Sequence, residues 1–210
     1  MVNEKSIRCT AHDVRGILSG AKHQTRRIMK PQPQYFEQQP HWRWGSGPVG
    51  PFAIASGDIP GCFGKYMPGE QLWVREAWAV VQTESQADFN AAESLYWYRA
   101  DGERPGVKWK PSIHMPRVAS RLTLEIAGVT VERVQDISYD DAEAEGTWAA
   151  CEDDPAIQNS ASYAAVAAGR RSVELVDYFA ALWNKVNGPN AWERNDWVWK
   201  VEFRLLEATP

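Results

Sequence analysis

The sequence has few of the residues from which disulfide frameworks and metal sites are built. Its three cysteines are far apart in the chain: Cys9, Cys62 and Cys151. Because their number is odd and no C-x-x-C pair occurs, we expect neither a disulfide framework nor a cysteine zinc site. The chain also has four histidines: His12, His23, His41 and His114. Their spacing matches neither zinc hydrolases nor zinc deaminases, so any hydrolysis is expected to need no metal and no other cofactor.

Long apolar runs are also missing. No run approaches the ~20 apolar residues that a membrane-spanning helix needs, and the first ten residues lack the apolar centre of a signal peptide. We therefore expect a cytoplasmic protein with no membrane partner. The 210 residues, 44% hydrophobic and 24% charged, suit one globular domain, residues 1–210, and are few for two.

The chain lacks an overall excess of positive charge. Its formal net charge is −4, which argues against a protein that coats long nucleic acids through their phosphates. Four cations nevertheless occur close together near the start: Lys22, Arg26, Arg27 and Lys30. A local site for an anion or a nucleotide is compatible with this distribution.

Three of these cations belong to an octapeptide that follows a helix-stop signal. Thr10 and Asp13 form a variant of the capping box at the start of a helix with an apolar stripe. Gly20 is expected to end that helix in the left-handed conformation. Residues 20–27 then read GAKHQTRR, and the chain is expected to continue as a strand to residue 28.

The octapeptide places a hydroxyl next to possible activating groups. Along a strand, Thr25 and Arg27 share one face and Arg26 points the other way. Lys22 has the opposite parity to Thr25, but it lies at the helix exit, where the backbone is not yet regular. A threonine hydroxyl needs a neighbouring base, and lysine serves only if its pKa falls well below ~10.4. Nearby guanidinium groups and partial burial are expected to lower the pKa of Lys22.

The rest of the chain predicts a mixture of strands and helices with two insertions. Strands are expected at residues 72–77, 96–99, 122–131 and 197–205, the third with a bulge at Gly128. Helices are expected at residues 138–146 and 172–187. One insertion, at about residues 30–69, holds seven prolines and is expected to form a lid or wall over a pocket. The other, at about residues 147–171, is rich in alanine and is expected to be partly flexible.

Two residues outside the octapeptide are candidates for the pocket. Glu76 shares a strand face with Leu72 and Val74, where a carboxylate is unfavourable unless it is paired. It lies either at the wet end of the strand or inside the pocket as an acceptor. His114 lies in a proline-rich loop, where simple solvation is the alternative.

Three sequence blocks in the same order resemble one family. The octapeptide fits G-x-K-x-x-T-x-R, the run KHQTRRIMKPQPQ covers residues 22–34, and PGEQLWVRE covers residues 68–76. With its tryptophan-rich last strand, the chain resembles from end to end the ASCH family, including phage and prophage members. These are small β-barrel domains related to the PUA domains that bind RNA. The resemblance implies an α+β fold, a PUA-like mixed β-barrel flanked by helices, here with two long insertions.

The resemblance also implies an activity. The ASCH members known as acetylcytidine amidohydrolases use a lysine, a threonine and a glutamate that sits on a short helix after the central strand. Carried over to this chain, the set is Lys22, Thr25 and Glu145, with Glu143 as a near competitor for the glutamate. Substrate contacts are expected from Arg26, Arg27, Glu76 and His114.

The expected function is a metal-free amidohydrolase that removes an acyl group from the exocyclic amine of N4-acylated cytosine, cytidine or a related nucleoside. Its partner would be a small nucleoside or nucleobase. One alternative is a non-catalytic PUA-like module in which Lys22, Arg26 and Arg27 hold the phosphate of a nucleotide or RNA. A ribonuclease, which needs the same cations and Glu145, is another. The acidic net charge disfavours long RNA, and nothing in the sequence indicates an oligomeric state.

Overall fold

The computed structural model describes residues 4–36, 41–43, 65–80, 95–152 and 154–208, and its centre is a five-stranded sheet. In the order of the sheet, the strands are β1 (Glu4–Arg8), β5 (Gln71–Arg75), β8 (Leu122–Arg133), β9 (Trp197–Ala208) and β2 (Gln24–Ile28). β1 and β5 are parallel, and the other neighbours are antiparallel. Two short antiparallel pairs lie outside this sheet: β3 (Gln34–Phe36) with β4 (His41–Arg43), and β6 (Trp78–Val80) with β7 (Tyr96–Tyr98).

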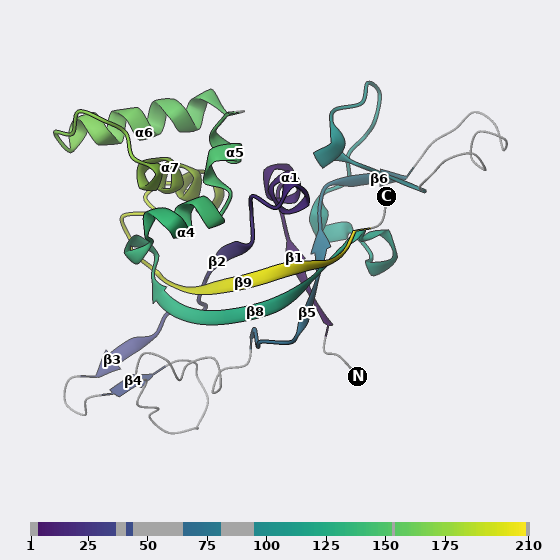
Figure 1. Ribbon diagram of the computed structural model, residues 1–210, viewed down its shortest axis with the longest axis horizontal. Helices are drawn as coiled ribbons and strands as arrows, with labels where there is room; N and C mark the ends of the chain where they lie inside the picture. Colours follow the sequence, from purple (N-terminus) through teal and green to yellow (C-terminus); the bar gives the residue numbers. More distant parts are fainter. Residues whose placement is uncertain (1–3, 37–40, 44–64, 81–94, 153, 209–210) are drawn as a thin grey trace.

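The sheet is curved, and its two edge strands approach each other at one point. β8 and β9 run side by side as long bent strands (Figure 1). Their register shifts between Ile126 and Gly128, which confirms the bulge expected at Gly128. β1 and β2 are the two edges, yet Arg27 Nη2 donates to the carbonyl oxygen of Arg8 at 2.8 Å. No strand pairing joins β1 to β2 in the described part of the chain, so the fold is a mixed α+β fold and the closed barrel stays a prediction.

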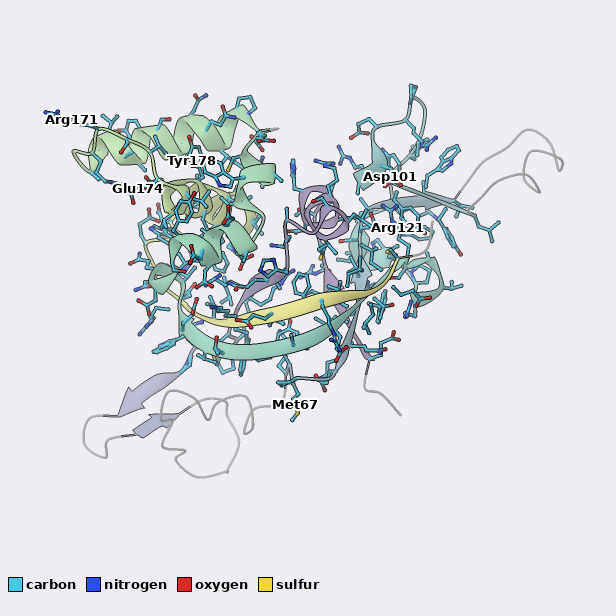
Figure 2. The ribbon with its side chains drawn as sticks, viewed as in Figure 1. Met67, Asp101, Arg121, Arg171, Glu174 and Tyr178 are labelled. Atoms are coloured by element: carbon cyan, nitrogen blue, oxygen red, sulfur yellow. The ribbon has the colours of Figure 1, made fainter. Side chains whose placement is uncertain are left out.

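Five α-helices occur in the described residues: α1 (Ala11–Ser19), α4 (Tyr139–Ala144), α5 (Thr147–Glu152), α6 (Pro155–Ala167) and α7 (Leu175–Asn187). They lie on one side of β8 and β9, with α4 to α7 gathered at one end (Figure 1). The loop between α6 and α7, with Arg171 and Glu174, lies at the opposite end of the molecule from Asp101 and Arg121 (Figure 2). None of the described helices is long and apolar enough to cross a membrane.

Short 3-10 turns connect several of these elements: η1 (Arg99–Asp101), η2 (Ser112–His114), η3 (Arg117–Ala119) and η4 (Val134–Asp136). The first three lie between β7 and β8, and η2 lies in the proline-rich loop that contains His114. The fourth joins β8 to α4. The turn η4 therefore leads the chain from the sheet to the helix that carries the candidate glutamate.

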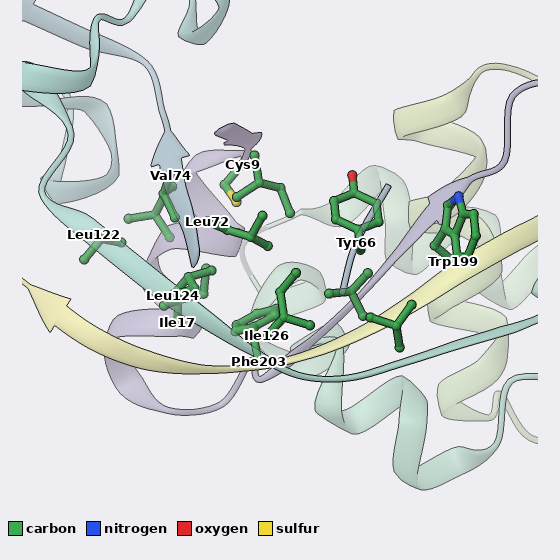
Figure 3. Close-up of a cluster of buried hydrophobic side chains, with 14 of the residues drawn as sticks. Cys9, Ile17, Tyr66, Leu72, Val74, Leu122, Leu124, Ile126, Trp199 and Phe203 are labelled. Atoms are coloured by element: carbon green, nitrogen blue, oxygen red, sulfur yellow. The ribbon is translucent and has the colours of Figure 1, made fainter. Parts of the chain in front are cut away.

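The main hydrophobic core lies between the sheet and α1 (Figure 3). Leu72 of β5 and Leu124 of β8 are fully buried in it, and Trp199 of β9 is buried in the same cluster. Each such side chain contributes roughly 1.5–3 kcal/mol relative to an exposed position. The neighbouring Val198 points to the other face of β9, where it packs with Phe179 of α7 in a second cluster. The two faces of β9 thus attach both α1 and the group of α4 and α7 to one sheet.

The predicted insertion at residues 147–171 forms two helices, which the sequence analysis did not predict. Asp154 caps α6 by accepting from the N–H of Ala156, and a proline follows at the first helical position. Ile157, Ala161 and Ala165, spaced four apart, bury one face of α6, and α6 packs on α7. Alanine is the best helix former, so this composition indicates a helix rather than a loop. In the other insertion, residues 37–40 and 44–64 lie outside the described residues, and with them most of the predicted lid.

Candidate functional site

The helix before the octapeptide begins and ends where the sequence predicts. Thr10 and Asp13 form the reciprocal capping box. Gly20 has a φ of +78°, the left-handed conformation that favours glycine. Two residues later, the Lys22 N–H donates back to the carbonyl oxygen of Gly16 at 2.9 Å. This bond folds the exit of α1 against the helix and turns Lys22 inward.

The second element of the site is the C-terminal end of α4. Ser138 caps the start of this helix by accepting from the N–H of Asp141, and Glu145 is the cap residue at its end. Glu145 forms a β-bridge with Lys22. The N–H of His23 adds a bond to the carbonyl oxygen of Ala144 at 3.0 Å. The ends of α1 and α4, separated by more than a hundred residues, are thus joined by backbone contacts.

Two glycines leave room for the Lys22 side chain between these helix ends. A Cβ atom at Gly16 would lie 3.0 Å from the Cβ of Lys22, and one at Gly146 would lie 3.1 Å from it. Gly16 lies inside α1, where glycine is about 1 kcal/mol less favourable than alanine. The passage of Lys22 explains its presence there. The sequence identifies Gly146 only as a helix stop and does not single out Gly16.

Lys22 is a buried ammonium group surrounded by acceptors. Its Nζ lies 2.8 Å from Glu145 Oε2, 2.7 Å from the Glu145 carbonyl oxygen and 3.3 Å from Asp13 Oδ1. Burial is the largest influence and lowers the pKa of Lys22, but Glu145 and Asp13 together outweigh it and raise that pKa above its ordinary value. The expectation of a lowered pKa was therefore wrong. The expectation considered only the neighbouring arginines of the octapeptide, whereas the carboxylates that raise the pKa come from α1 and from the end of α4.

Arg26 holds the same glutamate from the other side. Its Nη1 donates to Glu145 Oε1 at 3.1 Å, its Nη2 to Asp141 Oδ2 at 3.0 Å, and its Nε to Glu132 Oε1 at 2.7 Å. All three guanidinium nitrogens therefore donate to carboxylates. Arg26 therefore fixes the position of Glu145. Since every guanidinium nitrogen already donates to a carboxylate, none is free for the substrate contact expected of Arg26.

Lys22, Thr25, Arg26 and Glu145 line one cavity of about 100 Å³, which we call the ion-paired cavity. Thr25 is only 5% exposed. Among the residues that the structure describes, none forms a hydrogen bond with its hydroxyl. Unlike its charged neighbours, Thr25 thus has a side chain that no described residue engages in a hydrogen bond.

Aromatic and apolar side chains of α7 form the other wall of the ion-paired cavity. Phe179, Leu182 and Trp183 line it. Trp183 Nε1 is buried and has no hydrogen-bond acceptor in the described part of the chain. The sequence predicts Phe179, Leu182 and Trp183 only as the buried stripe of a helix, and their spacing gives no signal of a role in the site.

The predicted substrate contacts separate into two groups. Arg27 lines the ion-paired cavity, and its Nε has no acceptor among the described residues. Glu76 does not line it: its carboxylate is buried and pairs with Arg121 Nε at 3.0 Å. Burial is the main influence and raises the pKa of Glu76 against the opposing effect of Arg121. His114 is exposed in η2 and is also absent from the cavity wall.

The two candidate glutamates of α4 also differ in position. Glu145 is buried in the ion-paired cavity, whereas Glu143 is exposed and lines a separate hollow near Trp148. Asp13 is a site residue that sequence reasoning treats only as a helix cap. Its Oδ2 accepts from Thr10, and its Oδ1 faces Lys22. Burial raises the pKa of Asp13, but Lys22 and Arg27 reverse that effect and lower it.

The described residues contain no group of three or more His, Cys, Asp or Glu side chains arranged to hold a metal ion. The polar groups that line the ion-paired cavity include an ammonium group, two guanidinium groups, two carboxylates and a hydroxyl: Lys22, Arg26, Arg27, Glu145, Asp13 and Thr25. Comparison with protein-family models, with curated proteins and with solved structures finds no match for the chain.

Proposed function

We propose that this protein is a metal-free amidohydrolase of the ASCH family that removes an acyl group from the exocyclic amine of N4-acylated cytosine or cytidine. One observation carries the proposal: Lys22, Thr25 and Glu145 line a single buried cavity although a helix exit, a strand and a later helix supply them. These are the residue types that the family resemblance implies. A free hydroxyl beside a fixed carboxylate and ammonium pair has the components of a nucleophilic acyl transfer.

The charge state of Lys22 assigns the roles. Because its pKa is raised, Lys22 is an ammonium group that stabilises negative charge rather than a base. Glu145 is then the base that takes the proton as Thr25 Oγ1 attacks the acyl carbon. The oxyanion that forms is stabilised by Lys22. The C–N bond breaks as Glu145 returns the proton to the leaving amine, and water then hydrolyses the threonine ester to release the carboxylic acid.

The size of the ion-paired cavity limits which part of the substrate enters. Typical small-molecule pockets occupy roughly 300–1,000 Å³, whereas this one has about 100 Å³. The acyl group and the amine edge of the base therefore fill it, with Phe179 and Trp183 as the apolar wall against the ring. The unpartnered Trp183 Nε1 is a candidate donor to the base or to the acyl oxygen.

We also propose that the curved sheet corresponds to the PUA-like barrel of this family. The contact between Arg27 and the carbonyl oxygen of Arg8, which brings its two edge strands together, supports this assignment. The barrel interior would then be the main core, and the ion-paired cavity would lie at the barrel rim beside α1, α4 and α7.

A binding module and a ribonuclease remain alternatives, and in both Lys22 and Arg26 would have to be free to hold a phosphate. Lys22 and Arg26 are already paired with carboxylates, so they favour the acyl-transfer role. The test is an incubation of chelator-treated protein with N4-acetylcytidine and N4-acetylcytosine, followed by the loss of the acetylcytidine absorbance band. Turnover that the wild type shows and Thr25→Ala lacks would support the proposal. No turnover of any N4-acylated cytosine derivative would overturn it.

A further inference from the structure

A second cavity adjoins the ion-paired cavity and has an unusual charge. It has a volume of about 350 Å³ and is lined by five cations: Arg8, Arg27, Lys30, Lys65 and Arg75. No carboxylate is among its described lining residues, the others being Ser6, Ile7, Ile28, Tyr66 and Asn187. We call it the basic cavity. In a chain with four more acidic than basic residues, five cations around a cavity with no carboxylate among its described lining residues are a local reversal of sign.

The fold brings these cations together from separate segments. Arg8 and Arg75 are partners in the parallel pairing of β1 with β5, so they lie side by side where both strands end. Arg27 comes from β2, and Lys30 follows that strand. Lys65 precedes β5. The register of the sheet, rather than a run of basic residues in the sequence, therefore builds the cluster.

These five cations have no directly paired counter-charge in the described part of the protein. None of them makes an ion pair with a described carboxylate, and Arg27 Nε and Arg75 Nε are buried without acceptors. Burial, and next the positive charges of Arg27 and Lys30, lower the pKa of Lys65. Uncompensated like charges destabilise a folded protein unless an anion offsets them.

The basic cavity adjoins the ion-paired cavity and shares part of its wall. Arg27, Ile28 and Asn187 line both. A ligand whose reacting end fills the ion-paired cavity would extend past Arg27 into the basic cavity. A group held there is expected to be strongly anionic and to accept several hydrogen bonds, as a phosphate does.

We propose that the basic cavity binds the phosphate of a cytidine nucleotide whose base occupies the ion-paired cavity, so that the substrate is a nucleotide rather than a free nucleoside. The identity of the base rests on the proposed function, whereas the phosphate site rests on the basic cavity alone. Arg27, at the shared wall, contacts the nucleotide between its base and its phosphate. The ion-paired cavity would then bind the reacting group of the substrate, and the basic cavity would bind its phosphate.

The test is calorimetric titration of the full chain with cytidine and with cytidine 5′-monophosphate. The wild type is expected to bind the nucleotide at least about tenfold more tightly, because one charge-assisted contact is worth about that factor. Arg8→Gln and Lys65→Gln should each lose about tenfold for the nucleotide and little for cytidine. The matched control is Arg171→Gln, which removes one exposed positive charge in the loop between α6 and α7, outside the lining of the basic cavity (Figure 2). Equal binding of nucleotide and nucleoside, or equal losses in the control, would overturn the proposal.

Further arms identify the source of the phosphate. An RNA trinucleotide with a central cytidine and no terminal phosphate presents only diesters, and the monophosphate presents a monoester. Tighter binding of the trinucleotide would make an RNA strand the source, and the reverse would make it a free nucleotide. Both ligands lack the acyl group, so these measurements do not depend on turnover. A protein that hydrolyses acetylcytidine but shows no phosphate preference would refute only this inference; one that prefers phosphate but has no hydrolase activity would refute only the proposed function.

Discussion

The ion-paired cavity and the basic cavity share a wall and differ in charge balance. In the first, Lys22 and Arg26 are held by carboxylates from α1, α4 and β8. In the second, no described carboxylate pairs with Arg8, Lys65 or the other lining cations. Both cavities are lined by residues of β2, and Arg27 and Ile28 line both. The difference indicates that matched cations fix the reacting groups, while unmatched cations are available to a ligand.

The change expected to have the largest effect on this comparison is Glu145→Gln, which removes the base of the ion-paired cavity. The substitution keeps the size of the side chain and most of its hydrogen bonds but removes the titratable proton. Loss of a general acid or base typically lowers turnover ~100-fold to 10,000-fold. Affinity for cytidine 5′-monophosphate should be nearly unchanged, since the basic cavity is intact. Turnover by absorbance and affinity by calorimetry measure the two effects separately.

Glu143→Gln is the matched control for that variant. Glu143 is on the same short helix but is exposed and lies outside the ion-paired cavity. Its removal should leave turnover close to that of the wild type. If Glu145→Gln were active and Glu143→Gln inactive, the general base would be Glu143. If both variants were as active as the wild type, neither carboxylate would act in the mechanism.

The second prediction concerns stability. Lys22→Met removes a buried charge whose partners remain, and breaking a buried pair in this way lowers the free energy of unfolding by about 3–5 kcal/mol. We expect about 3 kcal/mol, the lower end of that range, because Arg26 still neutralises Glu145. Denaturant unfolding of the variant and the wild type at pH 7 measures the difference. A loss below about 0.5 kcal/mol, the range of ordinary surface changes, would mean that Lys22 is not held as an ion pair.

Local features of this architecture could be predicted from the sequence. The capping box of Thr10 and Asp13, the left-handed Gly20 and the bulge at Gly128 depend on residues close together in the chain, and all are present. The alternation of the last strand also holds, with Trp199 buried in the main core. That Lys22 and Glu145 face each other was implied by the family resemblance and by no local pattern.

Charge partners could not be predicted, because long-range packing decides them. Lys22 meets Glu145 across 123 residues of sequence, and this contact reverses the predicted direction of its pKa. Glu76 pairs with Arg121 rather than with the site. Periodicity shows which face of an element is buried, but not which element covers that face. For the same reason, the sequence did not show that Arg8 and Arg75 are neighbours in the sheet, so it did not predict the basic cavity.

The third prediction concerns the response to acid of Asp141, one of the carboxylates that hold Arg26. Burial tends to raise the pKa of Asp141, but its bonds with Lys200 and Gln24 and the charge of Arg26 lower it to about 2. A lowered carboxyl pKa stabilises the fold above the unfolded value of about 3.9, and this contribution is lost as the pH falls toward 2. Asp141 should thus contribute about 2 kcal/mol at neutral pH. Between pH 6 and pH 2, the free energy of unfolding should therefore fall less in Asp141→Asn than in the wild type, by this amount. Equal decreases in the two proteins would contradict the role given to Asp141.

The smallest change in stability is expected in the basic cavity, and its size tests the comparison directly. Lys65 is exposed and its pKa is lowered by burial and by Arg27 and Lys30. A lysine whose folded pKa is lowered destabilises the charged folded state, so stability should rise as the pH increases through that pKa. At pH 7 and without ligand, Lys65→Gln should therefore change the free energy of unfolding by less than about 0.5 kcal/mol and should not lower it.

The role of Lys65 in phosphate binding can be measured as ligand-induced stabilisation. A ligand at ten times its dissociation constant stabilises the folded state by about 1.4 kcal/mol, so cytidine 5′-monophosphate at that concentration should raise the melting temperature of the wild type. At the same concentration the increase should be much smaller in Lys65→Gln and unchanged in Arg171→Gln. A ligand-free Lys65→Gln protein as destabilised as Lys22→Met would show that the basic cavity is also held by ion pairs. The distinction between matched and unmatched cations would then fail, because a lysine that stabilises the empty fold has an acceptor within the protein and does not wait for a ligand.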